Sequence, residues 1–311
     1  MRAVFFGTPD FAVPSLTALL DAGVEVPLVV TQPDRPVGRH AAPLPSAVAR
    51  AAEARGIAVE KPERLRGNDE LLRRIRDLAP DVGVVVAYGR LLPNPLLALP
   101  RLAFVNVHAS LLPKYRGASP IQAAILAGDR ETGVVTMRVV EELDAGPLYR
   151  QRRVAIGDRE GADSLTRRLA AAGGEILVET LRELAAGSIE ASPQEGEPSF
   201  CKPIRREDGE VDWTLPAVEI ERRLRAYTPW PGLFTFLGEE RVKILAADAG
   251  PGGRAEPPGA FWSESERLFV SAGDGGSLEV KLLQRAGRKP VSGADFARAV
   301  RPSQRFGRTA P

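Results

Sequence analysis

The sequence predicts two domains: an α/β domain with a mostly parallel sheet, followed by a smaller β domain. A chain of 311 residues usually divides into more than one hydrophobic core. In the first half, apolar runs alternate with amphipathic stretches at the spacing of β-α-β units. Towards the C-terminus, short apolar runs are instead separated by turns rich in Gly and Pro, which is typical of a small β fold.

Local sequence patterns predict each strand and helix of the first domain. Four short apolar runs predict strands at residues 2–6, 26–31, 57–59 and 82–87. The last of these is apolar throughout, as expected for a strand that is buried on both faces. Apolar residues at helical spacing, followed by Gly23, Gly56 or Pro80, predict helices at residues 10–23, 46–55 and 69–78. A further strand leads to Asn106 and His108.

The chain continues this domain up to about residue 189 and then enters a proline-rich stretch without periodicity. We predict a helix, two strands and a long helix at residues 119–127, 134–140, 148–156 and 164–186. Gly173 and Gly174 weaken the pattern of the long helix. Residues 190–203 have no periodicity and contain three prolines, so we place a linker at 190–205, between domains at 1–189 and 206–311.

The second domain is predicted to be an OB-like β-barrel. After a helix at 218–226, five short β runs are separated by turns. The runs cover residues 233–237, 242–245, 260–262, 268–271 and 278–283.

Composition excludes several classes of protein. The single cysteine, Cys201, excludes an intramolecular disulfide and a cysteine metal cluster. The apolar N-terminal run is too short for the core of a signal peptide, and no stretch approaches the length of a membrane span. We therefore expect a cytoplasmic protein.

Positive charge is concentrated in the C-terminal tail. The whole chain carries a net charge of only +2, which predicts no partner. Residues 281–311 contain eight basic residues and one acid, which gives this tail +7 and leaves −5 for the residues before it. The tail is either a solvated terminus or a surface that contacts phosphates.

Two polar residues at a predicted strand end form the candidate catalytic centre. The strand period of two places Asn106 and His108 on one face. With a more distant acid such as Asp144, they suit acyl transfer to an amine. An Asn amide and an imidazole can stabilise the oxyanion, the imidazole can protonate the leaving group, and a carboxylate can orient the imidazole or accept the amine proton through water. On spacing alone, a hydrogen-bonded pair at a strand end and a turn aspartate remain the commoner alternative.

The long stretch around these residues resembles a known active-site signature. Residues 106–120 read Asn-Val-His-Ala-Ser-Leu-Leu-Pro-Lys-Tyr-Arg-Gly-Ala-Ser-Pro, and residues 144–147 read Asp-Ala-Gly-Pro. Together they resemble the signature of the formyltransferases that use 10-formyltetrahydrofolate. Three further stretches, at residues 6–11, 31–39 and 226–232, resemble the members of this family that formylate methionyl initiator tRNA.

The resemblance implies roles for particular residues. The first domain would be Rossmann-like. Asn106 and His108 would hold the formyl oxygen, His108 would donate the proton, and Asp144 would set the ionisation of His108. The amine would attack directly through a tetrahedral intermediate, without a metal ion. Folate would contact the motif Ser110, Leu111, Leu112 and Pro113 and the loops at residues 86–91 and 139–143, among them Tyr88, Gly89, Leu91, Val139 and Leu143.

The same resemblance implies a tRNA surface. Residues 33–45 match a loop that enters the acceptor stem; it carries Arg35, and Arg39 matches the key arginine of that loop. The family usually continues with lysines, whereas this chain has Ala41 and Ala42, which makes the loop less basic. The second domain would bind tRNA through basic residues of its tail, namely Lys281, Arg285, Arg288, Lys289, Arg301 and Arg305.

Two alternatives remain beside a monomeric enzyme that formylates methionyl initiator tRNA. One is a formyltransferase of the same family that acts on the amine of a sugar nucleotide. The basic tail and the loop with Arg39 favour tRNA over this alternative. The other is an RNA-binding protein without activity on a degenerate enzyme scaffold, which the presence of Asn106, His108 and Asp144 disfavours.

Overall fold

The computed structural model describes residues 1–36, 43–250, 252–300 and 305–308. It divides into two compact units. The first unit comprises residues 1–120, 131–155 and 165–202, and the second comprises residues 121–130, 156–164 and 203–311. The domain limits at 189 and 206 stay predictions, since the chain passes between the two units more than once.

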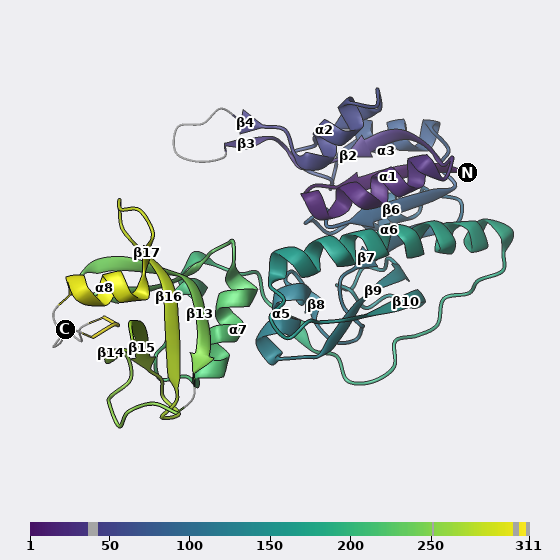
Figure 1. Ribbon diagram of the computed structural model, residues 1–311. Coiled ribbons are helices and arrows are strands. Elements are labelled where there is room, and N and C mark those ends of the chain that lie inside the picture. Colours follow the sequence, from purple (N-terminus) through teal and green to yellow (C-terminus); the bar gives the residue numbers. More distant parts are fainter. Residues whose placement is uncertain (37–42, 251, 301–304, 309–311) are drawn as a thin grey trace. The chain divides into compact units, whose positions relative to one another are not determined.

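The first unit is built on a seven-stranded sheet in the order β10-β9-β7-β6-β1-β2-β5 (Figure 1). The strands from β7 to β5 run parallel, whereas β9 is antiparallel to both β7 and β10. This confirms the prediction of an α/β domain with a mostly parallel sheet. The strands are β1 (Arg2–Gly7), β2 (Glu25–Val30), β5 (Ala58–Glu60), β6 (Val82–Val86), β7 (Ala103–His108), β9 (Glu131–Arg138) and β10 (Leu148–Ala155).

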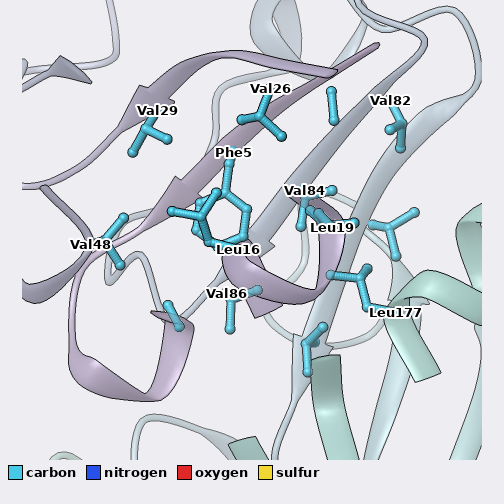
Figure 2. Close-up of a cluster of buried hydrophobic side chains, with 14 of the residues drawn as sticks. Phe5, Leu16, Leu19, Val26, Val29, Val48, Val82, Val84, Val86 and Leu177 are labelled. Carbon is cyan, nitrogen blue, oxygen red and sulfur yellow. The ribbon is translucent and has the colours of Figure 1, made fainter. Parts of the chain in front are cut away.

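Helices cover both faces of this sheet. One buried cluster joins Ala3 and Phe5 of β1 to α1, α2 and α6, as Figure 2 shows for part of it. A second cluster joins Val4 and Phe6 of the same strand to α3 and α4. The alternation along β1 explains why its run is continuously apolar: both faces are buried. The helices are α1 (Val13–Asp21), α2 (Ala47–Glu53), α3 (Asp69–Asp77), α4 (Asn94–Leu97) and α6 (Ala162–Ala186).

The two glycines within α6 do not interrupt the helix. A Cβ atom built on Gly173 would lie 2.8 Å from Cγ1 of Val107 in β7. A Cβ atom on Gly174 would lie 3.0 Å from the carbonyl oxygen of Pro14. The glycine pair therefore lets α6 approach the sheet and α1 closely, next to the strand that ends at His108.

The substitution Gly173→Ala should destabilise the protein, although alanine favours helix formation. The added methyl group must displace Val107, and overpacking of this kind costs about 1–3 kcal/mol. Urea denaturation of the variant measures the change. The matched control is Ala171→Ser on the exposed side of α6, where we expect a change within about 0.5 kcal/mol. A more stable Gly173→Ala protein would contradict the close approach.

The second unit contains an antiparallel sheet in the order β12-β13-β16-β15-β14, with β17 paired to β16 (Figure 1). Its strands are β12 (Leu233–Leu237), β13 (Glu240–Gly250), β14 (Phe261–Glu264), β15 (Arg267–Ser271), β16 (Ser277–Arg285) and β17 (Val291–Ser292). The five predicted β runs are thus confirmed as strands. Within the described residues, however, the ladder of strands does not close into a barrel.

Other elements are short or flank these sheets. The predicted helices near 119 and 218 are confirmed as α5 (Pro120–Ala127) and α7 (Ala217–Tyr227), whereas α8 (Gly293–Ala299) was not predicted. Two small sheets pair β3 (Arg35–Pro36) with β4 (Pro43–Leu44) and β8 (Arg116–Gly117) with β11 (Phe200–Cys201). Two short 3-10 turns, η1 (Asp10–Ala12) and η2 (Arg206–Gly209), complete the set. No helix in the described parts has the length and apolar character needed to cross a membrane.

Candidate active site

Asn106 and His108 share one face of β7, as their spacing predicts. The intervening Val107 and its neighbour Val105 belong to the cluster beneath α1 and α6. Phe104, which has the same parity as Asn106 and His108, belongs to the cluster on the other face. In register, Val85 and Val86 of β6 lie beside Asn106 and Val107, so the segments that follow β6 and β7 leave the sheet side by side.

The ring of His108 is buried and held from one side. Its Nε2 lies 3.0 Å from the carbonyl oxygen of Tyr115. A carbonyl can only accept, so Nε2 carries a hydrogen and donates it. Nδ1 lies 3.7 Å from Oδ2 of Asp144, too far for a hydrogen bond but close enough for an ion pair when the ring is doubly protonated. Both side chains are only about a tenth exposed, at 8% and 11%.

Asp144 reaches His108 from a strained loop. Its φ angle is +49°, in the left-handed region that Asp tolerates better than most residues. Its Oδ2 accepts a hydrogen bond of 2.8 Å from the amide of Gly117. A Cβ atom on Gly117, whose φ angle is +116°, would lie 2.3 Å from the carbonyl oxygen of Cys201. The carboxylate is thus held by an amide in a segment where only glycine fits.

The stretch predicted as a linker is folded against this centre. Residues of β11 pair in parallel with Arg116 and Gly117 of β8. The hydroxyl of Ser199 accepts a hydrogen bond of 2.9 Å from the amide of Tyr115, whose carbonyl holds His108. Sγ of Cys201 lies 3.5 Å from that same carbonyl, and burial raises the pKa of this thiol. Cys201 therefore has a structural place beside the site.

Gln194 joins two segments of the site and was not predicted. Its Nε2 donates hydrogen bonds of 2.7 Å and 2.9 Å to the carbonyls of Asp144 and Gly146. Its Oε1 accepts bonds of 3.1 Å and 2.7 Å from Nε and a terminal nitrogen of Arg116. The Arg116 side chain is only 12% exposed, so it is not a solvated surface charge. The sequence around Gln194 has no periodicity, and only the folded chain brings it here.

The residues predicted to bind folate follow β6 and β7. Ser110 is fully buried, and its hydroxyl donates a hydrogen bond of 2.6 Å to the carbonyl of Lys114. Leu112 is buried and precedes a cis peptide bond to Pro113. Leu111 and Pro113 are half-buried. The hydrogen bond between Ser110 and Lys114 therefore closes a turn around this motif.

Tyr88 contributes its side chain to the core. The ring is 1% exposed and contacts Phe6 edge-on, with 5.4 Å between centroids, and burial raises the pKa of its hydroxyl. Its carbonyl accepts hydrogen bonds from Thr8 and Gln32. Gly89 next to it has a φ angle of +82°. A role for Tyr88 in binding would thus be indirect, through the loop that it anchors.

The loops after β6 and β9 expose apolar side chains. Leu91 is 68% exposed and Leu143 is 49% exposed, with Val140 beside it at 37%. Val139 is half-buried, and its amide donates to the carbonyl of Phe104. Burying such exposed side chains under a flat aromatic ring system is favourable. These loops therefore offer exposed apolar side chains beyond the ends of β6 and β9.

The predicted tRNA-binding residues fall into three groups. Arg39 and Arg301 lie outside the described residues. Lys281 and Arg285 form ion pairs with Asp248 and Glu240. Arg35, Arg288, Lys289 and Arg305 are exposed, and the last three have no acidic partner within ion-pair distance among the described residues. Of the described tail residues predicted to bind tRNA, Arg288, Lys289 and Arg305 therefore have positive charge that no ion pair neutralises.

Among the residues that the structure describes, no three His, Cys, Asp or Glu side chains lie together as metal ligands.

Comparison with known families covers almost the whole chain. Residues 1–181 match the family model described as formyl transferase, and residues 203–301 match the one described as formyl transferase, C-terminal domain. A methionyl-tRNA formyltransferase of Myxococcus xanthus is 47% identical over 296 residues, covering 95% of this chain and 94% of the relative. One of Chromobacterium violaceum is 45% identical over 296 residues, covering 95% of both chains.

Solved structures share the fold at low sequence identity. WlaRD, a sugar 3N-formyl transferase, superposes with a TM-score of 0.65 at 17% identity, covering 93% of this chain and 99% of that one. An N-formyltransferase from Helicobacter canadensis gives a TM-score of 0.64 at 17% identity, covering 91% and 98%. At this identity the likeness concerns the fold alone.

Proposed function

The chain belongs to the methionyl-tRNA formyltransferase family, and we propose on that premise that it formylates the α-amino group of methionyl initiator tRNA. The formyl donor is 10-formyltetrahydrofolate, as in the formyl transferase family to which both parts of the chain match. The observation that carries the proposal is the identity of about 45% to methionyl-tRNA formyltransferases over nearly the full length of both chains.

We propose that Asn106, His108 and Asp144 carry out the transfer. The neutral amine attacks the formyl carbon, a C–N bond forms, and the carbonyl oxygen becomes an oxyanion that Asn106 and the ring of His108 stabilise. The amine loses its proton to water near Asp144, and His108 gives the Nε2 proton, which the Tyr115 carbonyl accepts in the free protein, to N10 of folate as that C–N bond breaks. Tetrahydrofolate leaves, and the formamide remains on the methionine. The distance of 3.7 Å between Nδ1 of His108 and Oδ2 of Asp144 supports a role for the carboxylate in orienting the ring.

We propose that folate binds at the loops that follow β6, β7 and β9. The exposed Leu91 and Leu143 would cover the pterin ring. Backbone groups of the buried motif that begins at Ser110 would bind its polar edge. Gly89 and Val139 lie in the same loops and would shape them. This arrangement follows the general rule that α/β sheets bind ligands beyond the carboxyl ends of their parallel strands.

We propose that the second unit is OB-like and binds the tRNA. Residues 305–307 form isolated bridges to Leu237 at the end of β12 and to Ala260 next to β14, the two edges of the sheet. Such bridges support a barrel-like arrangement without a continuous ladder. In this proposal the protein acts as a monomer in the cytoplasm, where initiator tRNA is charged.

Removing the unpaired charges after β16 should weaken tRNA binding. We expect the double variant Arg288→Ala and Lys289→Ala to reduce the slope of log K against log salt by about 2, because each lost phosphate contact removes about one released counterion. Titration of labelled tRNA at several salt concentrations measures this slope. Arg298→Ala is the matched control, since Arg298 is already paired with Asp295. An unchanged slope in the double variant would place the phosphate contacts elsewhere.

One assay tests the proposed function directly. Purified protein, 10-formyltetrahydrofolate and methionyl initiator tRNA should yield formylmethionyl-tRNA, separated after deacylation. The same protein is incubated with dTDP- and UDP-linked amino sugars, because the fold is shared with sugar N-formyltransferases. Product with a sugar nucleotide and none with the tRNA would replace the proposal with the sugar reaction. If neither acceptor gives a product, the remaining alternative is an RNA-binding protein without enzymatic activity.

A further inference from the structure

Gln194 uses all its hydrogen-bonding capacity to join Arg116 to the loop that carries Asp144. Its two donor hydrogens point at two carbonyls of that loop, those of Asp144 and Gly146, at 2.7 Å and 2.9 Å. Its oxygen receives two hydrogen bonds from Arg116. An amide is the smallest side chain that can donate twice and accept twice in this way.

The loop needs such support because its geometry is unfavourable. A residue other than glycine in the left-handed region costs about 1 kcal/mol, and the Asp144 carboxylate must also stay 3.7 Å from Nδ1 of His108. The carboxylate itself has a single described anchor, the amide of Gly117. Gly117 follows Arg116 directly, so Gln194 holds the anchor and the anchored loop at the same time.

We propose that Gln194 is a positioning residue for Asp144, acting through its bonds to the Asp144 and Gly146 carbonyls and through Arg116. It does not touch the reacting atoms. The inference rests on the proposed function, because Asp144 matters for rate only if His108 transfers a proton. Residues 192–201, which also include Ser199 and Cys201, then have two tasks: they lead towards the second unit, and they complete the active site.

The variant Gln194→Met tests this, because methionine keeps the length of the side chain and removes all four bonds. A misplacement of about 1 Å in a reacting group can reduce the rate about 10²-fold, so we expect kcat to fall about 10- to 100-fold. KM for folate should change less than about threefold, since Gln194 bonds the backbone of Asp144 and Gly146 but none of the residues that we propose to contact folate. Gln194→Glu should be similarly impaired, because a carboxylate keeps Arg116 but repels the two carbonyls.

Two controls separate positioning from general damage. Gln151→Met alters an exposed glutamine of β10 in the same unit and should leave kcat unchanged. In a background of Asp144→Asn, adding Gln194→Met should reduce kcat by less than about threefold, because residues that act as one unit are not additive. Full additivity of the two changes would mean that Gln194 acts by another route.

A second readout does not depend on activity. The amide of Gly117 donates to Asp144, so its hydrogen exchange, followed by NMR, should be at least about tenfold faster in Gln194→Met, while exchange within β7 stays the same. Unchanged exchange at Gly117, or an unchanged kcat, would overturn the inference. If the wild-type protein formylates no acceptor but the Gly117 amide still responds, the proposed function fails while the structural part of the inference stands.

Discussion

The variant His108→Ala should lose about 10³- to 10⁵-fold in kcat while it still binds folate. The ring would supply both a proton for the leaving nitrogen and part of the oxyanion stabilisation, and these effects contribute about 10²–10⁴-fold and 10²–10³-fold when removed singly. Folate binding should survive because Leu91 and Leu143, which we propose to cover the pterin ring, lie in the loops after β6 and β9, whereas His108 ends β7. Single-turnover kinetics with excess enzyme measure the rate, and quenching of protein fluorescence measures binding.

A second substitution guards against a trivial loss of structure. The ring of His108 is buried, and its Nε2 hydrogen satisfies the carbonyl of Tyr115. Alanine removes this donor and leaves the carbonyl with the weak thiol donor of Cys201, and a lost hydrogen bond of this kind costs about 1–3 kcal/mol. The variant His108→Gln can still donate to the carbonyl but cannot transfer a proton at neutral pH. It should be as impaired as His108→Ala, and near-normal turnover in His108→Gln would refute proton transfer by His108.

The fold was largely predictable because its signals are local. Strand β1 is apolar throughout because both of its faces are covered, and α3 has apolar residues on one face and caps at its ends. The glycine pair of α6 lowers helix propensity, and this much can be read from the sequence. The close approach to Val107 that the glycines allow can be seen only in the folded protein. The short helix α8 was missed, since seven residues carry too little periodicity.

The candidate site was predictable only where it is local. Asn106 and His108 follow from the strand period, and Asp144 from a resemblance over a long stretch. Gln194 could not be found in this way, because its partners lie 78 and 50 residues away in the sequence and nothing in a proline-rich stretch points to them. The same reason applies to Ser199, whose hydroxyl accepts from Tyr115. Long-range hydrogen bonds of single polar residues leave no pattern in one sequence.

The variant Asp144→Asn should lose about 10²- to 10³-fold in kcat without a change in fold. The Oδ1 atom of asparagine can still accept the hydrogen bond from Gly117, so the loop should keep its conformation. What disappears is the negative charge 3.7 Å from Nδ1 of His108, which would stabilise positive charge that develops on the ring, and the acceptor for the proton of the amine. Formylation kinetics measure the loss, and the NMR signal of the Gly117 amide reports the loop.

The size of this loss in kcat tests whether the negative charge of Asp144 assists His108 during the reaction. With only 8% and 11% of the two side chains exposed, water cannot replace the carboxylate, so removing its charge should be felt almost fully. Asp21→Asn at the exposed end of α1 is the matched control and should leave kcat unchanged. A loss of less than about fivefold in Asp144→Asn would mean that His108 and Asp144, 3.7 Å apart in the wild-type protein, form no ion pair that matters for the rate. Proton transfer by His108 would then have to proceed without Asp144.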